Sequence, residues 1–333
     1  MGDIAVVIIG RNEGERLKRC VSSVAGRSDL VVYVDSGSTD ASVRYANDQG
    51  IEVVELDMSI PFTAARARNT GFARVVEMRP GVEYVQFVDG DCELTSGWLP
   101  GAARELDSDV GVGVACGRLR ERHPQASIYN RLCDLEWDAP LGVVEACGGI
   151  FMARRSAFES VGGFNDRLIA GEEPELCVRL RAKGWKVKRV PLEMAWHDSA
   201  MTRFGQWWKR ASRGGHAAAE GVILHGVLGG KRSARMLARS MVWGAAAPLL
   251  FIIGLVAGWV YWPAWLGSGA VLGTYLLVAI RVWLGKRRQG VSSTDARLYA
   301  LYCMLGKVPE AQGAARCFIQ RAFGSRRGLI EYK

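Results

Sequence analysis

Two aspartates, one residue apart, follow an apolar stretch of the chain. Asp89 and Asp91 flank Gly90 directly after the run Tyr84–Val88, which has the composition of a buried strand. Alternate side chains of a strand lie on one side, so both carboxylates can face one point. The glycine permits close approach of backbone or ligand, and two such oxygen ligands suit Mg²⁺ or Mn²⁺ bound together with a diphosphate. The alternative is a polar turn, because Asp and Gly are common in turns.

Three further clusters of polar residues can contribute to such a site. Arg11 and Glu13 lie in the loop that follows the first apolar run. The segment Asp35–Asp40 follows the second run and is equally well explained as a turn that supplies a helix N-cap. Arg66 and Arg68 are two residues apart in a predicted helix, so at most one is expected to point into a site. That one could pair bidentately with a diphosphate, whereas the other would be a solvated helix charge.

Apolar runs alternate with helix-like stretches over the first two hundred residues. The predicted strands are Ile4–Ile9, Leu30–Val34, Ile51–Leu56 and Tyr84–Val88, and the predicted helices are Glu13–Val24, Thr39–Asp48 and Ala64–Met78. This alternation predicts an α/β, Rossmann-like domain over residues 1–200, with a mostly parallel sheet and helices on both faces. Ligands of such sheets bind at the carboxyl ends of the strands, which is where the polar clusters fall.

The ordered set of motifs resembles the family 2 glycosyltransferases, in particular the membrane-anchored type of bacterial polysaccharide and glycolipid synthesis. The motifs are Val34–Asp40, Ala67–Gly71, Asp89–Asp91, Gly148-Gly149, Val161–Asn165 and Gly171–Leu176, and together they cover about residues 4–190. The resemblance implies a GT-A fold, a nucleotide-sugar donor and inversion at the anomeric carbon.

The resemblance also implies roles for matching residues. The nucleobase would be read by Asp35, the nucleoside held by Glu13, and the diphosphate supported by Arg68. A divalent cation would be bound by Asp91, with Asp89 on the metal or the ribose. The predicted donor-binding set is Arg11, Glu13, Asp35, Arg68, Asp89 and Gly90.

An acidic pair before a helix supplies the catalytic base in this family, usually as Glu-Asp. Here the pair is Glu172-Glu173, and the extra methylene leaves open which of the two is the base. The alternative is a pair of acids that only stabilises the start of a helix. The chemistry requires a base and a cation in any case. A carboxylate that takes the acceptor's proton accelerates transfer by about 10²–10⁴-fold, and a cation with an arginine can absorb the charge of the leaving diphosphate.

Several residues are candidates for further contacts. His197 follows the strand-like run Trp185–Val190, and the resemblance suggests it as a further metal ligand, although a buried structural histidine fits equally. Gly148, Gly149 and Trp137 are predicted on the acceptor side. Gln206, Trp207 and Arg210 resemble the QxxRW box of processive synthases but lack the Trp after the arginine. An interfacial helix is the favoured interpretation of that segment.

Composition and charge indicate a folded protein with two different halves. Hydrophobic residues make up 49% of the 333 residues, and the eight cysteines are scattered without a CxxC pair, as in a reducing cytosol. The N-terminus lacks the basic region and cleavage site of a signal peptide. Residues 1–200 contain 24 Lys/Arg and 30 Asp/Glu, whereas residues 201–333 contain 19 and 4. The hydrophobicity of the basic half predicts contact with anionic membrane lipid and not with nucleic acid.

No charged residue occurs in the 40 positions from Met241 to Ile280. One helix of that length would measure about 60 Å, twice the roughly 30 Å hydrocarbon core. We therefore predict a transmembrane hairpin over residues 241–284 that turns at Tyr261–Trp265, with interfacial helices over 201–240 and a basic helical tail over 285–333. The alternative is a buried hairpin of a soluble protein. Basic residues at both ends of the hairpin place the catalytic half on the cytoplasmic side of the inner membrane.

The sequence thus predicts a membrane-anchored, metal-dependent, inverting hexosyltransferase. Its acceptor would be a saccharide on a lipid, for instance a polyprenyl diphosphate. One alternative is a subunit of a processive polysaccharide synthase, for which two spans are few. The other is a catalytically silent scaffold, against which the intact acidic residues argue. The oligomeric state, the donor and the linkage are not predicted.

Overall fold

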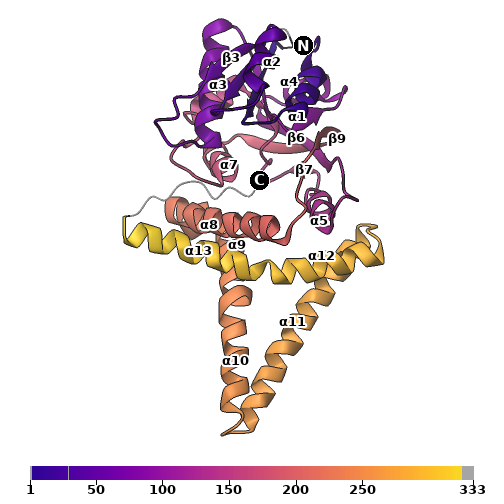
Figure 1. The fold of residues 1–333 in the computed structure, drawn as a ribbon, viewed down its shortest axis with the longest axis vertical. Helices are drawn as coiled ribbons and strands as arrows, with labels where there is room; N and C mark the ends of the chain where they lie inside the picture. Colours follow the sequence, from indigo (N-terminus) through magenta and orange to yellow (C-terminus); the bar gives the residue numbers. More distant parts are fainter. Residues whose placement is uncertain (1, 29, 325–333) are drawn as a thin grey trace. The chain divides into compact units, whose positions relative to one another are not determined.

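The computed structural model describes residues 2–28 and 30–324. Contacts within the chain divide it into two compact units, Met1–Thr202 and Arg203–Lys333. The first unit contains a sheet with helices packed against it, and the second is entirely helical in the part that the structure describes (Figure 1).

The first unit is built on a nine-stranded mixed sheet that is mostly parallel, as predicted. Its order is β3-β2-β1-β4-β8-β6-β9-β5, and β7 pairs with β9 outside this path. The strands β3, β2, β1 and β4 are parallel, so their carboxyl ends meet at one edge. The nine strands are β1 Ile4–Gly10, β2 Leu30–Asp35, β3 Glu52–Glu55, β4 Tyr84–Asp89, β5 Cys92–Leu94, β6 Val112–Glu121, β7 Gly142–Val143, β8 Phe151–Arg154 and β9 Lys186–His197.

Helices of the first unit pack on the sheet through small or apolar residues. Helix α3 contacts β1 and β2, and a Cβ on its Gly71 would lie 2.4 Å from Val7 Cγ1, so only glycine permits this approach. The rings of Phe87, Phe151 and Phe164 gather in the core beside them. The helices are α1 Glu15–Val24, α2 Ser42–Asp48, α3 Ala64–Met78, α4 Trp98–Ser108, α5 Ile128–Glu136, α6 Arg155–Ser160 and α7 Glu172–Ala182.

Three boundaries differ from the prediction for local reasons. Helix α1 begins two residues late because Gly14 has a φ of 51°, outside the helical region. Helix α2 begins at Ser42 and not at Thr39, because the backbone N–H groups of Thr39 and Asp40 donate to Asn12 Oδ1 instead. Strand β9 continues seven residues beyond the predicted Val190 and ends at His197.

The second unit contains two helices long and apolar enough to cross a membrane, Lys231–Ala257 and Pro263–Arg288. In the most apolar 18-residue stretch of each helix, only 11% and 6% is buried, respectively, which argues against a hairpin in the core of a soluble protein. The elements are α8 Phe204–Gly229, α9 Lys231–Met241, the π-helical η1 Val242–Ala246, α10 Ala247–Ala257, α11 Pro263–Arg288, α12 Ser293–Leu305 and α13 Lys307–Ala322. In Figure 1, α10 and α11 are joined by a short turn.

The helix limits in this unit also depart from the prediction. The first apolar helix begins ten residues before Met241, because α9, η1 and α10 follow one another without a loop. The second begins at Pro263, a position where proline costs no helical hydrogen bond. The predicted tail is divided at Gly306 into α12 and α13, and its residues 325–333 lie outside the described residues.

Candidate active site

A buried arginine connects two acidic residues that are far apart in the sequence. Arg68 on α3 is 3% exposed, and its guanidinium donates to Asp89 Oδ1 at 2.8 Å and to Glu172 Oε1 at 2.9 Å. Burial alone would lower the pKa of Arg68, but the two carboxylates outweigh it and raise the pKa above its ordinary value. Arg66 instead donates to the backbone carbonyls of residues 57, 60 and 61. Of the two predicted arginines, only Arg68 joins the acidic cluster.

Glycines let side chains and backbone approach this cluster closely. A Cβ on Gly149 would lie 3.1 Å from Arg68 Nη2 and 3.5 Å from Asp89 Oδ2. The loop that contains Gly148 and Gly149 therefore lies against the Arg68–Asp89 ion pair. A Cβ on Gly90 would lie 3.1 Å from Glu13 Cγ, so the predicted donor residue Glu13 packs directly over Gly90.

Asp35 is almost fully buried and accepts hydrogen bonds from its own turn. Its Oδ1 accepts from the Tyr33 hydroxyl at 2.9 Å, and its Oδ2 accepts from the backbone N–H groups of Gly37 and Ser38. Burial, reinforced by the charge of Asp35, raises the pKa of Tyr33. The structure thus gives Asp35 a turn-forming role, and its contact with a nucleobase stays a prediction.

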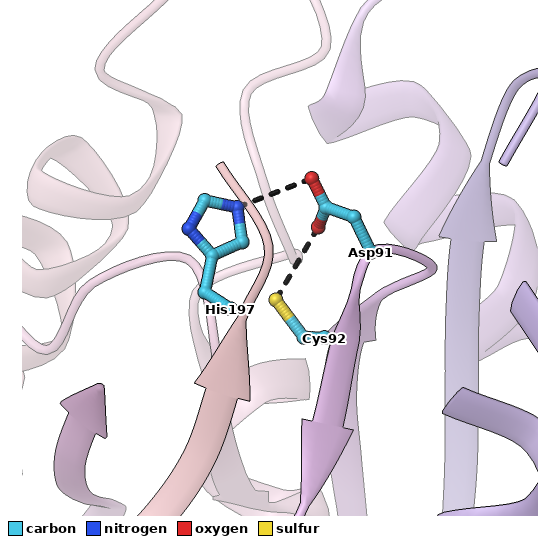
Figure 2. A group of neighbouring side chains, drawn as sticks. All are labelled: Asp91, Cys92 and His197. Atoms are coloured by element: carbon cyan, nitrogen blue, oxygen red, sulfur yellow. Dashed lines mark hydrogen bonds and ion pairs between the residues drawn. The ribbon is translucent and has the colours of Figure 1, made fainter. Parts of the chain in front are cut away.

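Asp91 and His197 meet at the end of the sheet that is formed by β5 and β9. Strand β5 pairs with β9 in a register that sets Cys92 opposite His197. His197 Nε2 lies 3.1 Å from Asp91 Oδ2, and the Cys92 thiol lies 3.3 Å from Asp91 Oδ1 (Figure 2). Among the described residues, two groups of His, Cys and acidic side chains are close enough to bind one ion, and these three residues form one of them. Asp89 belongs to neither group. Burial raises the pKa of the Cys92 thiol.

This donor set fits a divalent cation. A carboxylate and an imidazole suit Mn²⁺, whereas Mg²⁺ prefers an all-oxygen shell. Both side chains are at least partly buried, and His197 Nε2 and Asp91 Oδ2 are close enough to reach one ion. Ligation of a metal by His197, the last residue of β9, stays a prediction.

The two predicted base candidates face different surroundings. Glu172 is bonded to Arg68, whereas Glu173 is 6% exposed and lies beside two thiols. Glu173 Oε1 accepts from the backbone N–H of Cys147 and, at 3.1 Å, from the Cys177 thiol. Its Oε2 has no hydrogen bond to any residue among 2–28 and 30–324. One oxygen is thus fixed, and the other is available.

Two family models match overlapping parts of the chain. Residues 5–162 match the family model described as glycosyl transferase family 2, and residues 133–202 match one described as the N-terminal domain of galactosyltransferase. Residues 5–162 form a glycosyl transferase family 2 domain. The predicted GT-A fold of this glycosyltransferase domain is confirmed.

Curated relatives are glycosyltransferases by name. The pre-mycofactocin glycosyltransferase of Mycobacterium tuberculosis is 27% identical over 301 residues, which are 86% of this chain and 57% of the relative. The poly-beta-1,6-N-acetyl-D-glucosamine synthase of Staphylococcus aureus is 23% identical over 223 residues, which are 62% of this chain and 52% of the relative. The chain therefore spans little more than half the length of these relatives.

Solved structures of low sequence identity share the fold. The mannosyltransferase PcManGT of Pyrobaculum calidifontis, in complex with GDP-Man and Mn²⁺, is 17% identical with a TM-score of 0.57, and the match covers 94% of this chain and 89% of the other. Residues 1–349 of TarS of S. aureus are 13% identical with a TM-score of 0.51, and the match covers 96% of this chain and 92% of the other.

The remaining predicted residues are placed as follows. The Trp137 ring lies 5.0 Å from the His197 ring, so Trp137 borders the glycosyltransferase site. Arg11 is exposed in the loop after β1. Gln206, Trp207 and Arg210 belong to α8 in the second unit, where Gln206 caps the helix and Trp207 packs on Tyr302 at 5.0 Å. Their predicted contact with an acceptor stays a prediction.

Sequence reasoning missed four residues that help to form the site. Asn12 adopts a φ of 54° and bonds the loop after β1 to the loop after β2. Asn tolerates that conformation better than most residues, so its position after a strand was a usable signal. Cys92, Cys147 and Cys177 were predicted only as free thiols, and every described cysteine is indeed free. Their convergence with acidic groups depends on tertiary packing.

Proposed function

We propose that this protein transfers a hexosyl unit from a nucleoside-diphosphate sugar to a lipid-linked saccharide, with inversion and with the help of a divalent cation. The observation that carries the proposal is the buried Arg68 between Asp89 and Glu172. Asp89 lies two residues before Asp91, which pairs with His197. A cation site beside a buried guanidinium is what a diphosphate leaving group requires.

The donor would bind at the carboxyl ends of β1, β2 and β4. Glu13 and Arg11 would contact the nucleoside, and Asp35 would hold the turn against which the base lies. Arg68 can exchange an oxygen of Asp89 or Glu172 for a phosphate oxygen, because both kinds of anion accept its fork of N–H groups. Phosphate binding would thus cost little rearrangement of a side chain that is already buried and charged.

Asp91 and His197 would hold the cation, and Asp89 would contact it or the ribose. When bound, the ion supplies charge stabilisation for the departing diphosphate. The imidazole of His197 favours Mn²⁺ over Mg²⁺. The archaeal mannosyltransferase with the same fold was crystallised with GDP-Man and Mn²⁺, which supports a cation of this kind.

Glu173 is the better candidate for the base. Glu172 is engaged in an ion pair with the buried Arg68, so its carboxylate is less accessible to an acceptor hydroxyl. Glu173 is oriented through Oε1 by a backbone N–H and a thiol, while Oε2 can take the proton of the acceptor hydroxyl. One such base and one direct displacement give inversion.

The second unit suggests an acceptor at a membrane. Two exposed apolar helices flanked by Lys and Arg favour a hairpin with both ends on the cytoplasmic side of the inner membrane, in contact with anionic lipid. A lipid-linked saccharide would then be presented at the surface where the domain is anchored. Repeated addition, as the name of the staphylococcal relative suggests, is the second candidate, and product length separates the two.

The test uses the full chain in detergent or lipid nanodiscs with a panel of nucleotide sugars and Mn²⁺. The expected result is release of nucleoside diphosphate and movement of labelled sugar into the lipid extract, one unit per acceptor. Asp91→Asn should abolish both signals. Asp109→Asn is a matched control, because this carboxylate pairs with Lys186 at 2.9 Å and not with the site. Equal transfer to soluble acceptors contradicts the lipid acceptor, and absence of any transfer favours the silent scaffold.

A further inference from the structure

We propose that Cys147, Glu173 and Cys177 form a second cation site, which binds a soft divalent ion such as Zn²⁺. This group is separate from the Asp91–Cys92–His197 group, and it has two thiols where that group has one. The proposed transfer reaction uses the Cys177 thiol only to orient Glu173 and gives the Cys147 thiol no role, so the pairing of two thiols needs an explanation of its own.

The three side chains converge from two segments of the first unit. Glu173 and Cys177 are four residues apart on α7 and so share one face of the helix. Cys147 lies in the loop between β7 and β8, and its backbone N–H holds the Glu173 carboxylate in place. The ligand atoms of all three lie within 4.8 Å of one another. The group is therefore assembled before any ion is bound.

The separation of the sulfur atoms fits metal ligation better than a disulfide. The two thiols are hydrogen-bonded with their Sγ atoms 3.6 Å apart, and Cys177 Sγ is 3.1 Å from Glu173 Oε1. A tetrahedral zinc with Zn–S bonds of about 2.3 Å holds two sulfurs about 3.8 Å apart. A disulfide needs about 2.05 Å, so the sulfurs would have to approach by about 1.5 Å. The observed distance is close to the value for two ligands of one ion.

The donor set also selects the kind of ion. Two sulfurs and one carboxylate oxygen favour Zn²⁺, Cd²⁺ or Co²⁺ over Mg²⁺ and Mn²⁺, which prefer oxygen. Binding releases one proton from each thiol to solvent, and three protein ligands leave the fourth position of a tetrahedral ion to water. Cys147 is partly exposed, which provides a path of entry to the buried Cys177.

The consequence for catalysis rests on the proposed function, because it requires Glu173 to be the base. A Zn²⁺ ion bound through Oε1 withdraws electron density from the carboxylate, so Oε2 becomes a weaker acceptor for the proton of the acceptor hydroxyl. Zinc should then inhibit transfer even when Mn²⁺ saturates the Asp91–His197 pair. The binding site itself can be tested without any activity.

The decisive experiment is titration of the full-length, reduced protein with Co²⁺, which reports thiolate ligation through a charge-transfer absorption band. The wild type should develop the band to one equivalent, and Zn²⁺ should abolish it by displacement. Cys147→Ser and Cys177→Ser should each remove the band. Cys92→Ser is the matched control and should keep it, because Cys92 belongs to the other group. A band that survives in the Cys147→Ser/Cys177→Ser double variant, or that disappears in Cys92→Ser, overturns the proposal.

A second measurement needs no variant and so does not depend on folding of the serine variants. Alkylation of the native protein followed by peptide mass mapping reports the reactivity of each thiol. One equivalent of Zn²⁺ should slow alkylation of Cys147 about tenfold or more, whereas Mn²⁺ should leave it unchanged. Equal protection by both ions, or by neither, contradicts a soft-metal site.

Discussion

Glu172 and Glu173 are neighbours in the sequence, but their surroundings predict opposite effects of the same substitution. In Glu173→Gln the new amide oxygen can still accept from the Cys147 N–H and the Cys177 thiol, so we expect the free energy of unfolding to change by less than about 1 kcal/mol. The amide cannot take a proton. Turnover should fall about 10²–10⁴-fold, which corresponds to about 2.7–5.5 kcal/mol in the activation free energy.

Glu172→Gln removes a charged partner from the buried Arg68 guanidinium. The bond from Arg68 Nη1 is 2.9 Å long and mostly shielded from water, and a hydrogen bond to a charged group contributes about 1.5–3 kcal/mol. We expect a loss of stability of that order. Turnover should fall less than about tenfold, because Asp89 still holds the other side of the guanidinium.

The assay measures turnover from release of nucleoside diphosphate and stability from thermal unfolding of the same preparations. Glu175→Gln is the control on the same helix, because Glu175 pairs with Arg179 at 2.6 Å and should affect stability only. A large loss of turnover in Glu172→Gln, together with a nearly normal Glu173→Gln, would refute the assignment of the base.

Three further perturbations follow from single contacts. Removal of metal by a chelator should abolish transfer. In His197→Ala, a titration of activity with Mn²⁺ should show that a higher Mn²⁺ concentration is needed to restore transfer. Restoration at the Mn²⁺ concentration that suffices for the wild type contradicts ligation by His197. In Gly313→Ala the new Cβ would lie 1.8 Å from Ser212 O, so α8 and α13 must separate and the melting temperature should drop, at a cost of about 1–3 kcal/mol. Gly205→Ala, which meets open space, should show no such loss. Burial lowers the pKa of His216 below 6.5, although its bond to Gln320 opposes this. The unfolded state then binds the proton more readily, so stability is complete above about pH 6.5 and falls in more acidic solution. In His216→Gln the melting temperature should depend less on pH over that interval.

Local pattern was sufficient for strands that are continuous apolar runs and for a helix with an uninterrupted helical pattern. The apolar runs of β1, β2 and β4 and the whole of α3 were predicted within one residue of their limits. Parallel neighbours then place their carboxyl ends at one edge, so the polar residues after β1, β2 and β4 were predicted at the correct edge of the sheet. The ion pairs of Arg68 with Asp89 and Glu172 were not predicted.

The roles of residues that depend on hydrogen bonds between loops could not be predicted from the local sequence pattern. The start of α2 depends on Asn12, which is 27 residues before Thr39. The environment of Glu173 depends on Cys147, which is 26 residues before it. Propensity and periodicity describe only neighbours in the sequence, so the local pattern does not identify the partner in either contact, although the place of Asn12 after a strand was a signal for its backbone conformation.

The position of His197 illustrates how an irregular strand can hide a site. Cys116 of β6 pairs with Arg189 of β9, but Glu121 pairs with His197, so the register shifts by three residues along the two strands. Without this shift Glu121 would lie opposite Met194. Pro191 falls within the irregular stretch, where its missing N–H removes no regular ladder bond. Proline within this strand was therefore the signal that the strand continues through a bulge. Pairing of β5 with the continued part of β9 sets Cys92 opposite His197 and brings the imidazole to Asp91.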